Sequence, residues 1–170
     1  DISCSLVGSE MCIRDSHDTK ETGGYVMSEQ DTIQLLRECD AGIKMGVASI
    51  DEVVEYVKNQ DFKQKLLSYR TEHEKLKDEI QVLLEKHHDS GKEPTAMAKG
   101  MSWLKTNMKL AMDTSDQTIA DLMTDGCNMG VKSVYRYLNQ YATANEKAKE
   151  QSRKLANLEE KMCTEFRQFL

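Results

Sequence analysis

The sequence predicts an all-α protein in which four long helices form a bundle. Of its 170 residues, 31% are charged, 6% are aromatic and one is proline, a composition typical of helical bundles and unlike that of β-sheet proteins. Apolar residues recur three and four positions apart along four long stretches, which is the period of a helix with one buried face. No run of about 18 apolar residues occurs, so no transmembrane helix is expected.

The first two helices are expected at about 29–59 and 61–88. Ser28 is the expected N-cap of the first helix, because its hydroxyl can accept a hydrogen bond from a free backbone N–H. The linker at Asn59 and Gln60 is so short that the two helices must form an antiparallel hairpin. The 4-3 spacing of their buried faces favours packing at about 20°. These faces consist of Leu36, Asp40, Ile43, Val47, Ile50, Val54 and Val57 in the first helix and Phe62, Leu66, Tyr69, His73, Leu76, Ile80, Leu83 and His87 in the second.

The last two long helices are expected at about 116–141 and 145–169, with Thr114 or Ser115 as the cap of the earlier one. A short linker near Thr143 makes them a second antiparallel hairpin. Their expected buried faces consist of Ala120, Met123, Cys127, Val131, Val134, Leu138 and Tyr141 in one helix and Ala148, Ser152, Leu155, Met162, Phe166 and Phe169 in the other.

A long connection joins the two hairpins. The sequence DSGKEP at 89–94 interrupts the helical period, with Gly91 expected to stop one helix and Pro94 to start the next. A shorter helix is expected at about 95–112. Such a helix with extended flanks can cross a bundle about 40 Å long, which allows the second and third long helices to run parallel. The alternative is an up-down bundle with a helical flap.

Four segments of the chain carry a likeness to a known family. They read ECDAGIKMG at 38–46, EHEKLKDE at 72–79, MAKGMSWLKTNMK at 97–109 and DLMTDGCNMGVKSVYRYLNQY at 121–141. Residues 27–170 thereby resemble an uncharacterised bacterial family of ferritin-like four-helix bundles. This resemblance implies two antiparallel hairpins joined by a long crossover that contains a short helix, and it implies side-to-side association into a dimer.

The sequence departs from the ligand pattern of a ferritin-like di-metal site. That site takes a Glu from each of two helices and a Glu-x-x-His motif from each of the other two. The third long helix contains no Glu, and the only Glu-x-x-His motif is Glu85–His88 at the end of the second helix. A conventional di-iron oxidase is therefore not expected. The first hypothesis is a bundle without a cofactor that acts as a binding or structural module.

The second hypothesis is a metal-dependent oxidase or metal-storage protein with a non-standard site for iron, manganese or zinc. Asp40, His73, Glu79 and Asp125 are its candidate ligands, because carboxylates and imidazole bind these metals. Counted from the first turn, Asp40 is level with Glu79, and His73 is level with Gly46, whose missing side chain leaves room for an imidazole. The alternative is that each is a buried polar residue that sets helix register.

The expected short helix offers a candidate surface for a partner or a membrane. Trp103 lies beside its methionine stripe, and the lysines Lys99, Lys105 and Lys109 lie opposite that stripe. The alternative is that the methionines pack against the protein's own bundle, and binding to a membrane surface is not expected.

Residues 1–26 are expected to lie outside the fold. Residues 6–16, LVGSEMCIRDS, resemble the reading-frame translation of a transposase sequencing adapter and show neither a helical nor a strand period. Residues 17–26 are interpreted as the translation of an upstream leader that precedes a bacterial start at Met27. The predicted organisation is therefore a non-native leader at 1–26 and one domain at 27–170.

The charge of the chain indicates which partners to expect, and its cysteines indicate the redox state of its compartment. The net charge of −6 gives no electrostatic footprint for nucleic acid. Cys39, Cys127 and Cys163 lack metal-type spacing and no secretory signal follows Met27, so reduced thiols in a cytoplasm are expected. These thiols are interpreted as inert core residues. No phosphate loop, catalytic triad or nucleotide fingerprint is present in the sequence.

Overall fold

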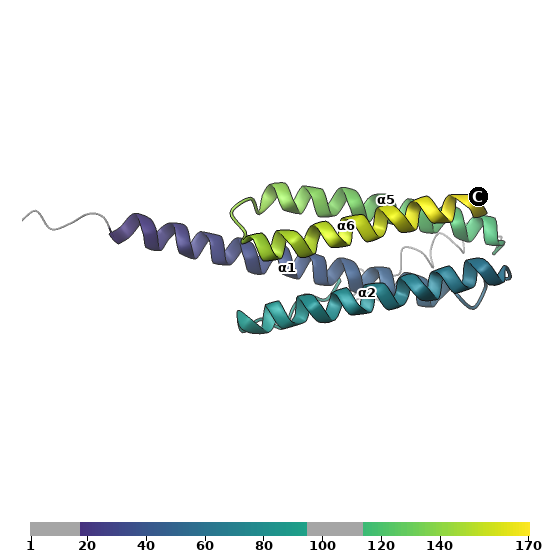
Figure 1. Ribbon diagram of the computed structural model, residues 1–170, viewed down its shortest axis with the longest axis horizontal. Coiled ribbons are helices and arrows are strands. Elements are labelled where there is room, and N and C mark those ends of the chain that lie inside the picture. The colour runs from purple at the N-terminus through teal and green to yellow at the C-terminus, as the bar shows by residue number, and fades with distance from the viewer. Residues whose placement is uncertain (1–17, 95–113) are drawn as a thin grey trace, which may run out of the picture.

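The computed structural model describes residues 18–94 and 114–170, with side chains from residue 28 onward. In these ranges all regular secondary structure is helical, which confirms the predicted all-α class. Four long helices pack against one another along their lengths (Figure 1). They are α1 (Asp18–Val53), α2 (Gln60–Lys86), α5 (Asp116–Gln140) and α6 (Glu146–Phe166), and the short 3-10 helix η1 (Arg167–Phe169) follows α6. The short helix expected at 95–112 lies outside the described residues.

Polar side chains start three of the helices where the sequence predicts a helix start. Asn59, Ser115 and Asn145 each accept a hydrogen bond from the backbone N–H three residues later, as an N-cap does. Each cap replaces one hydrogen bond that the first turn of a helix lacks. The starts of α2, α5 and α6 are therefore encoded locally.

The start of α1 corrects the expected boundary. Helix α1 begins at Asp18, so the expected N-cap Ser28 lies inside it, and the Ser28 hydroxyl donates instead to the Thr143 carbonyl oxygen at 2.8 Å. The N-terminal part of α1 extends past the ends of the other helices (Figure 1). The helix therefore reaches into the segment that was predicted as a leader, while residues 1–17 lie outside the described residues.

Contacts at both ends of the bundle fix the directions of the helices. The Asp116 carboxylate at the start of α5 accepts hydrogen bonds from the backbone N–H groups of Lys58 and Asn59, each at 2.8 Å, in the turn before α2. At the opposite end, Thr143 donates to the Asp31 carboxylate of α1. Helices α2 and α5 therefore start at the same end of the bundle. Helices α1 and α6 each pack against both α2 and α5.

Two apolar clusters fill the interior, one toward each end. The first surrounds Phe62, Tyr69 and Phe166, whose rings make edge-to-face contacts at 5.1 and 5.6 Å between centroids. The second includes Leu36, Ile80 and other aliphatic residues of α1, α2 and α6. Burial of these apolar side chains supplies most of the favourable free energy of folding. No helix in the described part of the chain is long and apolar enough to cross a bilayer.

The predicted buried faces are confirmed with small shifts. In α2 the residue that is fully buried near the C-terminus is Leu84, whereas the predicted Leu83 is only half-buried. An α-helix drifts by about 20° per heptad relative to a strict seven-residue repeat, so the buried face moves by one residue over several turns.

A buried carboxylate on α1 holds the chain that follows α2. Asp40 is fully buried and accepts hydrogen bonds from the Gln81 side chain at 2.8 Å and from the backbone N–H of Lys92 at 2.9 Å, and it pairs with Lys44 at 3.0 Å. The chain reaches this position through Gly91, whose φ is +86°. Every oxygen of the carboxylate thus has a partner, which offsets the cost of burying its charge.

Replacing Gly91 with alanine should lower the free energy of unfolding by about 1–3 kcal/mol, because a side chain strains a backbone at positive φ. The added Cβ would also overlap the Asp40 carboxylate. Gly126→Ala is the matched control, since a Cβ there meets nothing within 4 Å and alanine favours a helix by up to about 1 kcal/mol. Urea denaturation of both variants measures the two changes, and a Gly91→Ala protein as stable as Gly126→Ala would contradict this role of Gly91.

Candidate functional site

One polar layer separates the two apolar clusters. His73 of α2 is fully buried, Glu159 of α6 is 8% exposed, and His73 Nε2 lies 3.1 Å from Glu159 Oε1. The other two helices contribute Gly46 from α1 and Gly130 from α5 to the same layer. Each helix therefore supplies one residue to this level of the bundle. Two of these residues carry ionisable side chains and two carry no side chain at all.

The two glycines make the space that the ionisable pair fills. A Cβ on Gly46 would lie 3.2 Å from two atoms of the His73 ring, and a Cβ on Gly130 would lie 3.3 Å from Glu159 Cδ. Both distances are shorter than ordinary van der Waals contact. The prediction that Gly46 leaves room for the His73 imidazole is thus confirmed, and Gly130 does the same for Glu159.

The hydrogen bonds of His73 define where its protons lie. Nδ1 is 2.7 Å from the backbone carbonyl oxygen of Tyr69, and a carbonyl oxygen only accepts, so Nδ1 carries a hydrogen. The contact between Nε2 and Glu159 Oε1 therefore needs one more proton, placed on either of the two atoms. The pair is an imidazolium with a carboxylate, or a neutral imidazole with a carboxylic acid.

Opposing influences act on the pKa of His73. Burial lowers this pKa because it disfavours the imidazolium, while the hydrogen bond and the negative charge of Glu159, the Tyr69 carbonyl and the charge of Glu72 raise it. The net result is a pKa above the ordinary value of 6.5. Cys127 of α5 also faces Glu159, and burial followed by the negative charge of that carboxylate raises the pKa of its thiol. The surroundings of the layer thus favour the protonated forms of His73 and Cys127.

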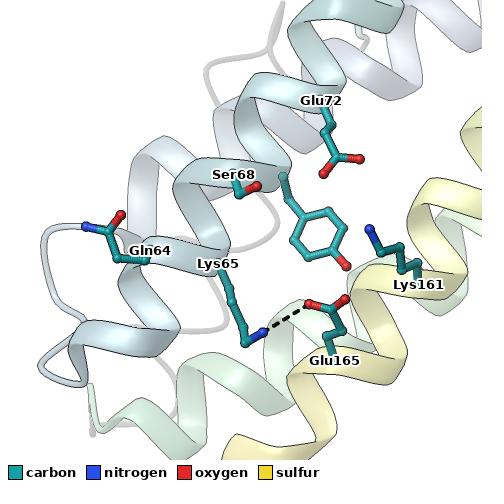
Figure 2. Close-up of a pocket in the computed structure, with 7 residues that line it drawn as sticks. Gln64, Lys65, Ser68, Glu72, Lys161 and Glu165 are labelled. Atoms are coloured by element: carbon teal, nitrogen blue, oxygen red, sulfur yellow. Dashed lines mark hydrogen bonds and ion pairs between the residues drawn. The ribbon is translucent and has the colours of Figure 1, made fainter.

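A shallow groove lies on the surface between α2 and α6, beside the Tyr69 ring. Figure 2 shows the charged residues that line it, including Lys65 and Lys161 and the carboxylates Glu72 and Glu165. Lys65 Nζ pairs with Glu165 at 3.2 Å, and Lys161 Nζ lies 5.7 Å from the centre of the Tyr69 ring. Because two cations and two anions line this groove, it presents no net charge of either sign to a ligand.

The four predicted metal ligands do not come together. Asp40 is held by Gln81, Lys44 and the Lys92 backbone, as described above. Glu79 lies on the surface of α2 and pairs with Lys154 of α6 at 3.0 Å, and Asp125 is exposed on α5. Only His73 of the four belongs to the polar layer. Within 18–94 and 114–170, no three His, Cys, Asp or Glu residues are placed so that they could hold a metal ion.

The predicted partner surface falls outside the structure. Trp103, Lys99, Lys105 and Lys109 all belong to 95–113, which is not among the described residues. Their role as a partner or membrane surface stays a prediction.

Glu159 belongs to the site but is not among the residues that the sequence pattern predicts on the buried face of the last helix. The expected buried face of the last helix included Leu155 and Met162, which are seven positions apart. Position 159 completes the 4-3 spacing between them, so a heptad count places it on the buried face. An acid at a buried position of one helix, level with a histidine at a buried position of another, is the signal that could have paired Glu159 with His73.

The residues that the structure describes define a class: a bundle of four long helices whose core contains a buried acid–histidine pair. A scan against protein-family models, a search of curated proteins and a search of solved structures each found no match.

The free energy of unfolding should fall as the pH rises above 6.5 and through the raised pKa of His73. A group whose pKa is higher in the folded state stabilises that state fully below its unfolded pKa and loses this contribution as it deprotonates. His73→Gln should remove this pH dependence. His87→Gln is the control, because His87 contacts Glu29 near the surface. Urea denaturation across pH provides the measurement, and identical profiles for His73→Gln and wild type would refute the shared proton.

Gly46→Ala should lower the free energy of unfolding by about 1–2 kcal/mol, because the added methyl group overpacks a buried ring that cannot move aside. Gly42→Ala is the matched control one turn earlier on α1, where a Cβ meets only Leu155 Cδ2 at 3.9 Å. There the gain in helix propensity should raise the free energy of unfolding by about 0.5–1 kcal/mol. Thermal and urea denaturation distinguish the two signs, and an increase in both variants would show that the layer tolerates a side chain at position 46.

Proposed function

We propose that this protein is a ferritin-like helical bundle that acts as a binding or structural module and not as a conventional di-metal oxidase. The observation that carries the proposal is the polar layer at the centre of the bundle. There His73 and Glu159 bind each other, and the facing helices contribute Gly46 and Gly130. A ligand held by all four helices would have to bind at this level, and there the side chains of His73 and Glu159 already occupy the space and hydrogen-bond to each other.

The path of the chain supports the ferritin-like connectivity. Helices α2 and α5 start at the same end, and each is flanked by α1 and α6, which start at the other end. A chain with this order needs one long crossover between its two hairpins. The segment between α2 and α5 is the place for it, as the resemblance to ferritin-like bundles implies.

The residues present do not fit a di-metal centre. That centre needs carboxylates from all four helices together with two histidines. The polar layer offers one carboxylate, on Glu159, and one imidazole, on His73, while α1 and α5 contribute glycines.

Partners and compartment follow from the same proposal. Association into a homodimer is the arrangement that the ferritin-like resemblance implies, and an acidic chain with a net charge of −6 is not suited to nucleic acid. Cys39, Cys127 and Cys163 are free thiols, which fits a reducing compartment such as a cytoplasm.

One observation favours the alternative of a metal-binding oxidase or metal-storage protein. His73 directs Nε2 toward a carboxylate while its Nδ1 is tied to a backbone carbonyl. Metal-bound histidines are oriented by this kind of hydrogen bond. In that alternative, His73 and Glu159 would be two ligands of iron, manganese or zinc.

Measurement of metal content distinguishes the two functions. The full chain, purified without chelators or an affinity tag, should contain iron, manganese and zinc well below one equivalent per chain, and light scattering should give twice the chain mass of 19.4 kDa. The control is Glu79→Gln, which changes a surface carboxylate. Stoichiometric metal that is lost in His73→Gln and retained in Glu79→Gln would replace the proposed function with the metal-binding alternative.

A further inference from the structure

The groove between α2 and α6 contains charged side chains that have no role in holding the bundle together. Its volume is about 350 Å³, which is at the lower end of the range for small-molecule sites. Lys65 and Glu165 of its lining form an ion pair at 3.2 Å. Glu72 of α2 and Lys161 of α6 also line the groove, and neither forms an ion pair within the described residues. One anion and one cation in the groove therefore lack a partner of opposite charge.

A second acid–lysine pair on the same two helices does form an ion pair. Glu79 follows Glu72 by one heptad on α2, and Lys154 precedes Lys161 by one heptad on α6. Because the two helices are antiparallel, the two pairs occupy equivalent positions. Glu79 and Lys154 lie 3.0 Å apart, whereas Lys161 Nζ lies over the Tyr69 ring, 5.7 Å from its centre. The unpaired charges are therefore a property of the groove and not of the helix spacing.

The hydroxyl of Tyr69 adds a buried donor to the same groove. Tyr69 is 2% exposed, and its hydroxyl forms no hydrogen bond within the described residues. Burial, followed by the nearby Glu165 carboxylate, raises the pKa of this phenol, so it keeps its proton, but the two groups are not in hydrogen-bonding geometry. Buried polar groups are normally hydrogen-bonded, and a buried donor without an acceptor destabilises a protein. A ligand that supplies an acceptor would therefore complete this group.

These three groups together suit a small ligand that carries both charges. Lys161 and the Tyr69 hydroxyl both donate hydrogen bonds and suit a carboxylate, whereas Glu72 accepts hydrogen bonds and suits an ammonium group. Figure 2 shows the side chains of Glu72 and Lys161 directed into the groove from α2 and α6. Hydrogen bonds between charged groups are stronger than those between neutral ones. A ligand with a single charge would pair with one of the two residues and leave the other unpaired.

We propose that this groove binds a free α-amino acid as its zwitterion. The carboxylate of the ligand lies at Lys161 and the Tyr69 hydroxyl, and its ammonium group lies at Glu72. A ligand without net charge also agrees with the equal numbers of cations and anions in the lining. The inference goes beyond the proposed function, because the groove lies on the surface, outside the polar layer.

The probes are L-alanine, N-acetyl-L-alanine, which lacks the ammonium group, and L-alaninamide, which lacks the carboxylate. The full chain is prepared with isotope-labelled tyrosine, and NMR follows the ring signals of Tyr69, which the Tyr69→Phe variant identifies. L-alanine should shift these signals until they saturate. Each of the other two probes should bind about tenfold more weakly, because each loses a hydrogen bond between charged groups.

Two variants test the two ends of the ligand separately. Glu72→Gln should weaken the binding of L-alanine about tenfold and leave that of N-acetyl-L-alanine unchanged, because this probe has no ammonium group to lose a partner. Lys161→Gln should weaken the binding of L-alanine by a similar factor and leave that of L-alaninamide unchanged, because this probe has no carboxylate. Each variant thus has a probe whose binding it should not alter.

The matched controls are Glu79→Gln and Lys154→Gln, which change the equivalent pair one heptad away on the same helices. Both should bind L-alanine as the wild type does. Tyr69 signals that do not shift or do not saturate with L-alanine, or equal affinities for the three probes, would overturn the proposal. A loss of binding in Glu79→Gln as large as that in Glu72→Gln would overturn it as well.

Discussion

A single proton between His73 Nε2 and Glu159 Oε1 makes the centre of this bundle possible. Without it, the lone pair of His73 Nε2 and the carboxylate of Glu159 would face each other at 3.1 Å inside the bundle. With it, both residues are satisfied, because His73 also donates to the Tyr69 carbonyl. A buried pair of this kind stabilises little on balance, but removing one partner leaves the other unpaired at a large cost. The remaining contacts of the layer are arranged around this requirement.

Two kinds of interaction in the core have different effects on the fold. Apolar clusters on either side supply most of the favourable free energy, yet aliphatic side chains tolerate small shifts of one helix along another. The pair tolerates none: moving α6 by one heptad would place Glu159 among apolar residues of one cluster or the other. A buried polar contact between helices therefore selects one register among several that the apolar clusters alone would allow.

The sequence predicted those contacts of the layer that can be found by counting residues from a nearby turn. Counting residues from the turn at Asn59 placed His73 opposite Gly46, and the fixed rise of a helix makes such counts accurate near a tight turn. The partners of Asp40 were out of reach for the same method. One is the backbone of Lys92, which lies beyond the end of α2 and reaches Asp40 only because Gly91 adopts a positive φ. Glu79 was expected level with Asp40 as a second metal ligand, but it lies on the exposed side of α2 and pairs with Lys154 instead.

Because Gly46 and Gly130 leave the space that His73 and Glu159 occupy, a substitution at one of these four positions requires substitutions at the others. A larger residue at 46 needs a smaller one at 73, and a smaller residue at 73 leaves Glu159 without its proton partner, so an apolar residue at 159 must follow. Single steps along this route pass through overpacked or unpaired intermediates, whereas the end state, an all-apolar layer, would fold well. Chains that share this fold should therefore carry either the whole set of glycine, histidine, glycine and glutamate or none of it.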